Sequence, residues 1–112
     1  MEIRTIYIWV DDLRDMPSHY DFCYKSVWDF IRDFDQPYTT PKGDYHCVID
    51  LDHDAGDYER FGGDYYNILK WLEHFDADFV REHCTFKFHT ANPVGRENMI
   101  NICDRNGWKY EK

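Results

Sequence analysis

The chain has 112 residues, a formal net charge of −9 and an aromatic content of 19%. This length predicts one domain, residues 1–112, that buries roughly two-thirds of its unfolded surface in a single core. Binding a DNA or RNA duplex requires clustered basic residues, and the 13 lysines and arginines are scattered along an acidic chain, which excludes duplex binding as the main role. So many rings leave some aromatic surface exposed, which makes a homodimer possible.

The sequence contains neither a membrane-targeting pattern nor a CxxC cysteine pair. The residues after Met1 do not form a secretion leader, and no stretch approaches the roughly 20 apolar residues of a membrane span. We therefore expect a soluble cytoplasmic protein without a membrane partner. No CxxC pair occurs, so we expect the cysteines to be free and reduced. They are Cys23, Cys47, Cys84 and Cys103.

The first third of the sequence predicts two strands and a helix. Residues 3–10 are nearly all apolar or aromatic, which is typical of a strand buried on both faces of a parallel sheet. Residues 11–18 lack helical periodicity and predict a loop, and residues 20–25 alternate as an edge strand does. Ser26 can cap a helix, because Asp29 follows three residues later and apolar residues then recur at helical spacing.

The middle of the sequence predicts a third strand and a second helix. Residues 38–44 contain proline and glycine and predict a loop, and residues 46–51 predict a strand. After a polar loop at residues 56–63, Asp64 can cap a helix with one apolar face. That face contains Tyr65, Ile68, Leu69, Leu72 and Phe75.

The last third predicts a strand, a helix and a short final strand. Residues 84–88 predict the fourth strand. Asn92–Pro93 predicts a helix start, because a capping side chain is followed by proline at the first helical position, and Asn106–Gly107 predicts its end after about Arg105. Residues 108–110 suffice only for a short last strand. The inward residues of this helix would be Met99, Ile102 and Cys103.

The order of these elements predicts the fold class. Parallel strands joined by right-handed crossovers give an α/β three-layer sandwich with a mostly parallel sheet. The sequence provides no helix between the first and second strands. We therefore expect a reduced form of this fold, with one crossover helix missing.

Polar clusters follow three of the predicted strands. They are Asp11–Asp12, Asp52–His53–Asp54 and His89–Thr90–Ala91–Asn92. In an open α/β sheet, ligands bind outside the carboxyl ends of the strands, where the strand order reverses. The three clusters therefore predict one shared pocket.

The acidic residues of these clusters predict a metal ion. Asp11, Asp12, Asp52 and Asp54 offer hard oxygen ligands, and converging carboxylates repel one another unless a cation neutralises them. This favours Mg²⁺ or Mn²⁺ as a cofactor. The alternative is that the acids are only helix caps and solvated loop ends.

Two histidines at the predicted pocket could transfer protons. His53 and His89 are the candidates, because an imidazole group ordinarily titrates near neutral pH and a leaving alkoxide must receive a proton when a phosphodiester opens. Either could instead join the metal ligands, which would shift the preference toward Mn²⁺ or Zn²⁺. Asp50 alternates with Leu51 and could point to the opposite layer, so we place it outside the predicted site.

Phosphate contacts are predicted at the start of the last helix. Asn92, Gly95 and Arg96 lie where free backbone N–H groups and the helix dipole attract an anion, and Arg96 can pair with two phosphate oxygens. Arg14 is a second candidate for this contact. The alternative is an ordinary capped helix with a surface arginine.

Three strings of residues resemble the cyclic-phosphate processing receiver family, which consists of small domains related to two-component receivers. The strings are Trp9–Arg14 with Pro17 following, Leu51–Gly56, and His89–Arg96 with Met99. They occur in the right order, at predicted strand ends, and together span nearly the whole chain. The resemblance implies a receiver-like, flavodoxin-like fold and phosphoester chemistry.

The likeness to receivers also implies roles for single residues. Asp11 and Asp12 match the acidic pair, Asp52 matches the phosphoacceptor, and Thr90 matches the hydroxyl that contacts the phosphoryl group. Asp54 matches the residue whose backbone reaches the metal. These assignments agree with the metal and phosphate sites expected from the residues themselves.

Three functions fit these residues. The first is a metal-dependent phosphodiesterase-type hydrolase that opens or cleaves a cyclic phosphate or nucleotide phosphoester, with Asp52, His53 and His89 as catalytic candidates. The second is a module that sequesters a cyclic nucleotide or another small phosphorylated ligand. The third is a phosphoaccepting or pseudo-receiver signalling domain, in which Lys109 would help Thr90 to bind the phosphoryl group.

Overall fold

The described part of the chain contains five strands, which form one parallel sheet in the flavodoxin-like order β2-β1-β3-β4-β5. This description comes from a computed structural model and covers residues 4–34 and 45–111, so the predicted loop at residues 38–44 lies outside it. The strands are β1 (Arg4–Val10), β2 (Phe22–Tyr24), β3 (Tyr45–Leu51), β4 (Cys84–Phe88) and β5 (Lys109–Glu111). Each predicted strand is present, with small differences at its ends.

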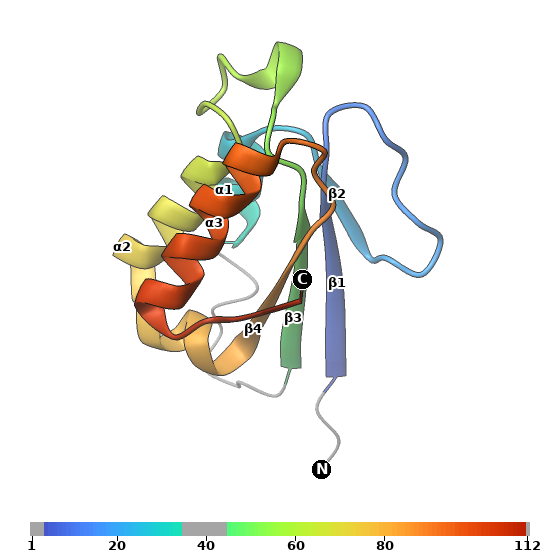
Figure 1. Cartoon of the computed structure of the whole chain (residues 1–112). Coiled ribbons are helices and arrows are strands. Elements are labelled where there is room, and N and C mark those ends of the chain that lie inside the picture. The colour runs from blue at the N-terminus through green and yellow to red at the C-terminus, as the bar shows by residue number, and fades with distance from the viewer. Residues whose placement is uncertain (1–3, 35–44, 112) are drawn as a thin grey trace.

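Within residues 4–34 and 45–111, three α-helices lie on the same face of this sheet (Figure 1). They are α1 (Val27–Phe34), α2 (Tyr66–His83) and α3 (Pro93–Asn106), and a short 3₁₀ turn, η1 (Gly56–Tyr58), precedes α2. The crossovers β2–α1–β3, β3–α2–β4 and β4–α3–β5 all advance in one direction along the sheet, so right-handed connections place every helix on one side.

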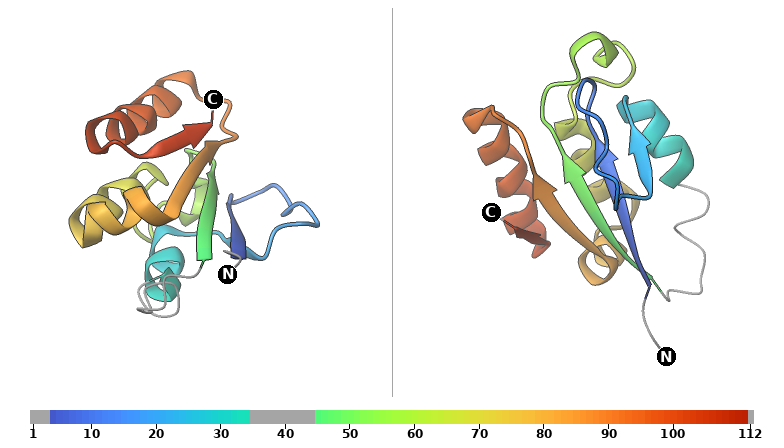
Figure 2. Two further views of the ribbon diagram at one scale, coloured as in Figure 1. Left: turned by 90° about the horizontal axis from the view of Figure 1, so that it is seen from below. Right: turned by 90° about the vertical axis from the view of Figure 1, so that its right-hand side faces the viewer.

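The opposite face is covered by the loop at residues 11–21, which projects away from the helices (Figures 1 and 2). No helix occurs in this described segment, as predicted for the connection between β1 and β2. Tyr20 of the loop is 7% exposed and its ring contacts those of Tyr7 and Trp9. The predicted reduced receiver-like sheet is therefore confirmed, and its third layer is a loop instead of a helix.

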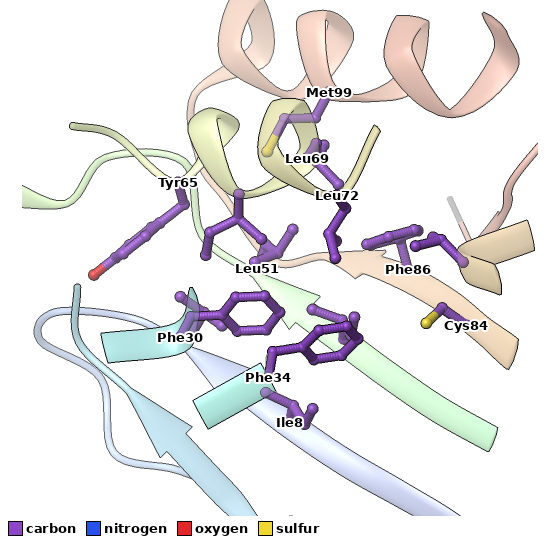
Figure 3. Packing of buried hydrophobic residues seen from close by; sticks show 14 of the residues in the cluster. Ile8, Phe30, Phe34, Leu51, Tyr65, Leu69, Leu72, Cys84, Phe86 and Met99 are labelled. Carbon is purple, nitrogen blue, oxygen red and sulfur yellow. The ribbon is translucent and has the colours of Figure 1, made fainter. Parts of the chain in front are cut away.

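The hydrophobic core lies between the sheet and the helices (Figure 3). Strand alternation sends every second side chain into it, as the buried pattern of β4 shows for Cys84, Phe86 and Phe88. The predicted inner face of α2 packs there, although Phe75 is only partly buried. Among the described residues, no helix is both long and apolar enough to cross a membrane.

The N-terminal caps of α1 and α3 form as predicted, and the predicted cap of α2 does not. The Ser26 hydroxyl accepts the Asp29 N–H at 3.1 Å, and the Asn92 side chain accepts the Gly95 N–H at 2.9 Å. The predicted Asp64 cap is wrong, because the Asp64 carboxylate accepts the N–H of Ala55 at 3.0 Å. This hydrogen bond joins the two ends of the loop between β3 and α2. The helix instead starts after Tyr65, which makes no side-chain cap.

All four cysteines are free, as expected. Cys47 and Cys84 are fully buried register partners on β3 and β4, and Cys103 is buried on α3. Burial raises the pKa of the Cys103 thiol to about 12, which makes it a poor nucleophile at neutral pH. These three cysteines therefore contribute to packing, whereas Cys23 on β2 is exposed.

Candidate functional site at the carboxyl ends of the strands

The three predicted polar clusters meet at one end of the sheet. The strand order reverses between β1 and β3, so the ends of these two strands flank the switch point. Backbone hydrogen bonds join Asp52 N–H to Val10 and His89 N–H to Leu51, each at 3.0 Å. A hollow of about 450 Å³ opens beside them. Its lining includes Asp12, Arg14, Asp52, Asp54, Thr90 and Asn92.

Acidic side chains are crowded at this hollow. Ligand atoms of Asp11, Asp52 and His89 lie within 4.8 Å of one another, so the two carboxylates of this group are close enough to share a metal ion. Asp12 lies next to them, and burial, together with the negative charges of Asp11 and Asp52, raises the pKa of its carboxyl group. A divalent cation would relieve this repulsion, and the oxygen donors suit Mg²⁺ or Mn²⁺.

Asp11 is held more tightly than the other carboxylates. Its side chain is 1% exposed, and one oxygen accepts the N–H groups of Leu13 at 2.9 Å and Arg14 at 3.0 Å. The second oxygen lies 2.8 Å from Nε2 of His89. Burial alone would raise the pKa of Asp11, but these hydrogen bonds outweigh it and the pKa lies below its usual range. Asp11 is therefore a fixed negative charge at neutral pH.

His89 joins Asp11 to Asp50 across the site. Its Nδ1 lies 2.7 Å from Asp50, its Nε2 contacts Asp11, and its ring stacks on Trp9 at a centroid distance of 3.8 Å and an angle of 4°. Burial would lower the pKa of His89, but the two carboxylates outweigh it and raise it. With an acceptor at each nitrogen, the ring is best satisfied as an imidazolium that donates both N–H groups.

Asp50 belongs to this network, although sequence analysis placed it outside the site. It is 5% exposed, and its second oxygen accepts the Tyr20 hydroxyl at 2.5 Å. Asp50 does point away from the helices, as expected, but His89 points the same way. The strand register could have indicated this, because Asp50 pairs with Lys87 and His89 lies two residues further along the same face.

His53 occupies a separate position at the start of α3. Its Nδ1 lies 2.7 Å from Asp54, and the Asn92 amide donates to the same Asp54 oxygen at 3.3 Å. The hydrogen bonds from His53 and then from Asn92 outweigh burial and lower the pKa of Asp54. Nε2 of His53 has no hydrogen-bond partner within residues 4–34 and 45–111. The carboxylate of Asp54 therefore lies with His53 and Asp64, apart from the Asp11–Asp52–His89 group.

The ring of His53 rests directly on Gly95, where a Cβ atom would collide with it. We therefore expect Gly95→Ala to lower the free energy of unfolding by about 1–3 kcal/mol, the usual cost of overpacking. In a His53→Ala background the collision is absent, and alanine should then stabilise the helix by roughly 0.5–1 kcal/mol relative to glycine. Urea denaturation of the four proteins measures both effects, and an equal cost in the two backgrounds would contradict this contact.

The predicted phosphate-binding residues differ in their access to the hollow. Arg14 lines it and donates from its guanidinium to the His89 carbonyl at 2.7 Å. Thr90 and Asn92 also line it, but the Gly95 N–H is already bonded to the Asn92 side chain, and the Arg96 N–H to the Asn92 carbonyl. The Arg96 side chain is not among the lining residues. Arg14 is therefore better placed than Arg96 for an anion in this hollow.

The sequence also matches a known family. The sequence model described as the cyclic-phosphate processing receiver domain matches residues 6–105. The chain belongs to this family. No curated protein and no solved structure matches the chain significantly. The match covers all three strand ends that form the hollow, including the acidic residues of β1 and β3.

Within residues 4–34 and 45–111, no lysine lines this hollow, although a phosphoaccepting receiver would place one beside Thr90. Lys109 was the candidate partner for Thr90, but it pairs with Thr85 in the sheet register. Thr90 lies five residues after Thr85 and two beyond the end of β4, which is about 16 Å for an extended chain. Lys109 is therefore at the opposite end of β4 from the acidic cluster.

Proposed function

We propose that this member of the cyclic-phosphate processing receiver family hydrolyses a cyclic phosphate in a metal-dependent reaction. The observation that carries the proposal is the shared hollow, where carboxylates lie opposite groups able to bind a phosphate. Water would add to phosphorus, one ester P–O bond would break, and the leaving alkoxide would take a proton. The ring opens to a phosphomonoester that stays attached through its remaining ester bond.

Asp11, Asp12 and Asp52 would hold the Mg²⁺ or Mn²⁺ ion. Asp11 and Asp52 have ligand atoms within 4.8 Å of each other. Their negative charges also contribute to the raised pKa of Asp12, so a cation among the three carboxylates would relieve their repulsion. When bound, a divalent cation polarises a phosphoryl oxygen and offsets its developing negative charge. Asp11 would serve as the rigid ligand, since two backbone N–H groups and His89 fix its orientation.

His53 would act as the general acid or base. Asp54 accepts the hydrogen bond at Nδ1 and so orients the ring. His53 itself does not line the hollow, but its neighbours Asp52 and Asp54 do, and Nε2 would exchange a proton with a substrate bound there. His89 is less suited to this step, because carboxylates occupy both of its nitrogens. We assign His89 the role of holding Asp11 in place. Arg14 and the hydroxyl of Thr90 would bind the phosphate oxygens.

The metal site is tested by thermal unfolding in the presence of Mn²⁺. At a concentration 100 times the dissociation constant, binding should stabilise the wild type by about 2.7 kcal/mol, because the cation binds only the folded protein. Asp52→Asn should abolish most of this effect, while Asp78→Asn, an exposed carboxylate on α2, should retain it. Equal stabilisation of the wild type and Asp52→Asn would exclude this site.

A second measurement separates hydrolysis from sequestration. Wild-type protein is incubated with Mn²⁺ and adenosine 2′,3′-cyclic phosphate, then denatured, and the released nucleotide is identified. The proposal expects a phosphomonoester in excess of the protein. Recovery of intact ligand in an amount equal to the protein would indicate a binding module instead.

A further inference from the structure

A second hollow, of about 250 Å³, lies between the start of α1 and the loop after β3. Two exposed rings form its apolar part: Trp28 is 58% exposed and Phe61 is 37% exposed. The rings meet edge to face, with centroids 5.9 Å apart and an angle of 68°. Ser26, Asp29, Arg32 and Tyr58 complete the lining. The hollow thus combines aromatic faces with charged groups.

The backbone holds these two rings in position. The Trp28 N–H donates to the Phe61 carbonyl at 3.1 Å. Gly62 has a φ of 112° and packs so closely on α1 that a Cβ atom there would lie 2.8 Å from the Trp28 ring. The Arg60 guanidinium lies 5.2 Å from the centroid of the Phe61 ring. Two large rings fixed in water-exposed positions are typical of a binding surface.

The aromatic hollow adjoins the acidic one through η1. Gly56 lines the acidic hollow and Tyr58 lines the aromatic hollow, and two residues of chain span at most about 7 Å. A third hollow shares Tyr58 and extends to Lys25, whose ammonium group lies 3.3 Å from the Asp12 carbonyl. A ligand anchored at the acidic cluster could therefore reach the two rings by way of Lys25 and Tyr58.

We infer that the Trp28–Phe61 hollow binds the base of a cyclic nucleotide whose phosphate lies at the acidic hollow, so the substrate is a nucleotide and not a base-free cyclic phosphate. A nucleobase is planar and stacks on aromatic rings, and its edge carries both donors and acceptors. Asp29 can accept from such an edge and Arg32 can donate to it. This inference rests on the proposed function for the position of the phosphate.

The test compares ligands with and without a base. Trp28→Ala should weaken the binding of adenosine 2′,3′-cyclic phosphate by about 10- to 100-fold, the usual effect of removing one stacking ring. Its affinity for glycerol 1,2-cyclic phosphate, which has no base, should not change. Trp28→Phe, which keeps a ring, should restore most of the nucleotide affinity. Phe22→Ala removes a ring that is 42% exposed outside these hollows and serves as the matched control.

A nucleoside tests the hollow without the phosphate. Millimolar adenosine should shift the indole resonance of Trp28 in the NMR spectrum of the wild type. No shift with adenosine, or equal nucleotide affinity in the wild type and Trp28→Ala, would overturn the inference. The proposed function fails by a different result: the wild type does not hydrolyse adenosine 2′,3′-cyclic phosphate in the presence of Mn²⁺, and Mn²⁺ stabilises Asp52→Asn as much as it stabilises the wild type.

Discussion

His53→Gln is expected to lower the turnover of adenosine 2′,3′-cyclic phosphate by about 10²- to 10⁴-fold, the range in which general acid–base groups contribute. Glutamine can still hydrogen-bond to Asp54, but it cannot gain and release a proton near neutral pH. The Asp54 carboxylate and its contact with Asn92 would remain, so the stabilisation by Mn²⁺ should persist. Steady-state kinetics and thermal unfolding of the same preparation measure the two properties.

The matched control is His74→Gln, which changes an exposed histidine on α2. It should turn over the nucleotide at the wild-type rate. His89→Gln should instead lower stability and weaken Mn²⁺ binding, because Asp11 loses the group that orients it. Full activity in His53→Gln would remove this histidine from the mechanism and return the acid–base role to His89.

Asp50→Ala is expected to lower the free energy of unfolding by about 3 kcal/mol, the lower end of the range for breaking a buried ion pair. The substitution removes an acceptor from His89 and leaves the Tyr20 hydroxyl, which is buried with its ring, without its partner. Asp78→Ala, at a side chain 78% exposed, should change stability by less than about 0.5 kcal/mol. Urea denaturation of the three proteins provides the comparison.

The decrease in the free energy of unfolding caused by Asp50→Ala should also depend on pH. The folded protein raises the pKa of His89, so the resulting stability is full below the ordinary histidine pKa of about 6.5 and is lost as pH rises through the raised value. The stability that comes from the lowered pKa of Asp11 is fully present above about pH 3.9 and is lost as pH falls further. The difference between wild type and Asp50→Ala should therefore be largest at mildly acidic pH and shrink in alkaline solution. A constant difference would contradict an imidazolium at His89.

Local patterns were sufficient to predict the elements and several of their ends. Ser26 and Asn92 cap their helices because each capping bond spans only three residues, so nearby sequence determines it. The apolar run in β1 predicted burial on both faces, and the loop that carries Tyr20 provides the second cover. Asp64 shows the limit of this reasoning. Its side chain was predicted to accept an N–H group of the following helix, but in the folded protein it accepts the N–H of Ala55.

The sequence by itself determined that acids and histidines would gather at one end of a parallel sheet, because strand ends meet there whatever the side chains do. Only the tertiary structure decided which groups pair. His89 faces Asp50 and Asp11 since strand register places them on one side, and His53 stays apart because its ring rests on Gly95 of another element. These contacts join residues 39 to 78 positions apart, so no local pattern in the chain specifies them.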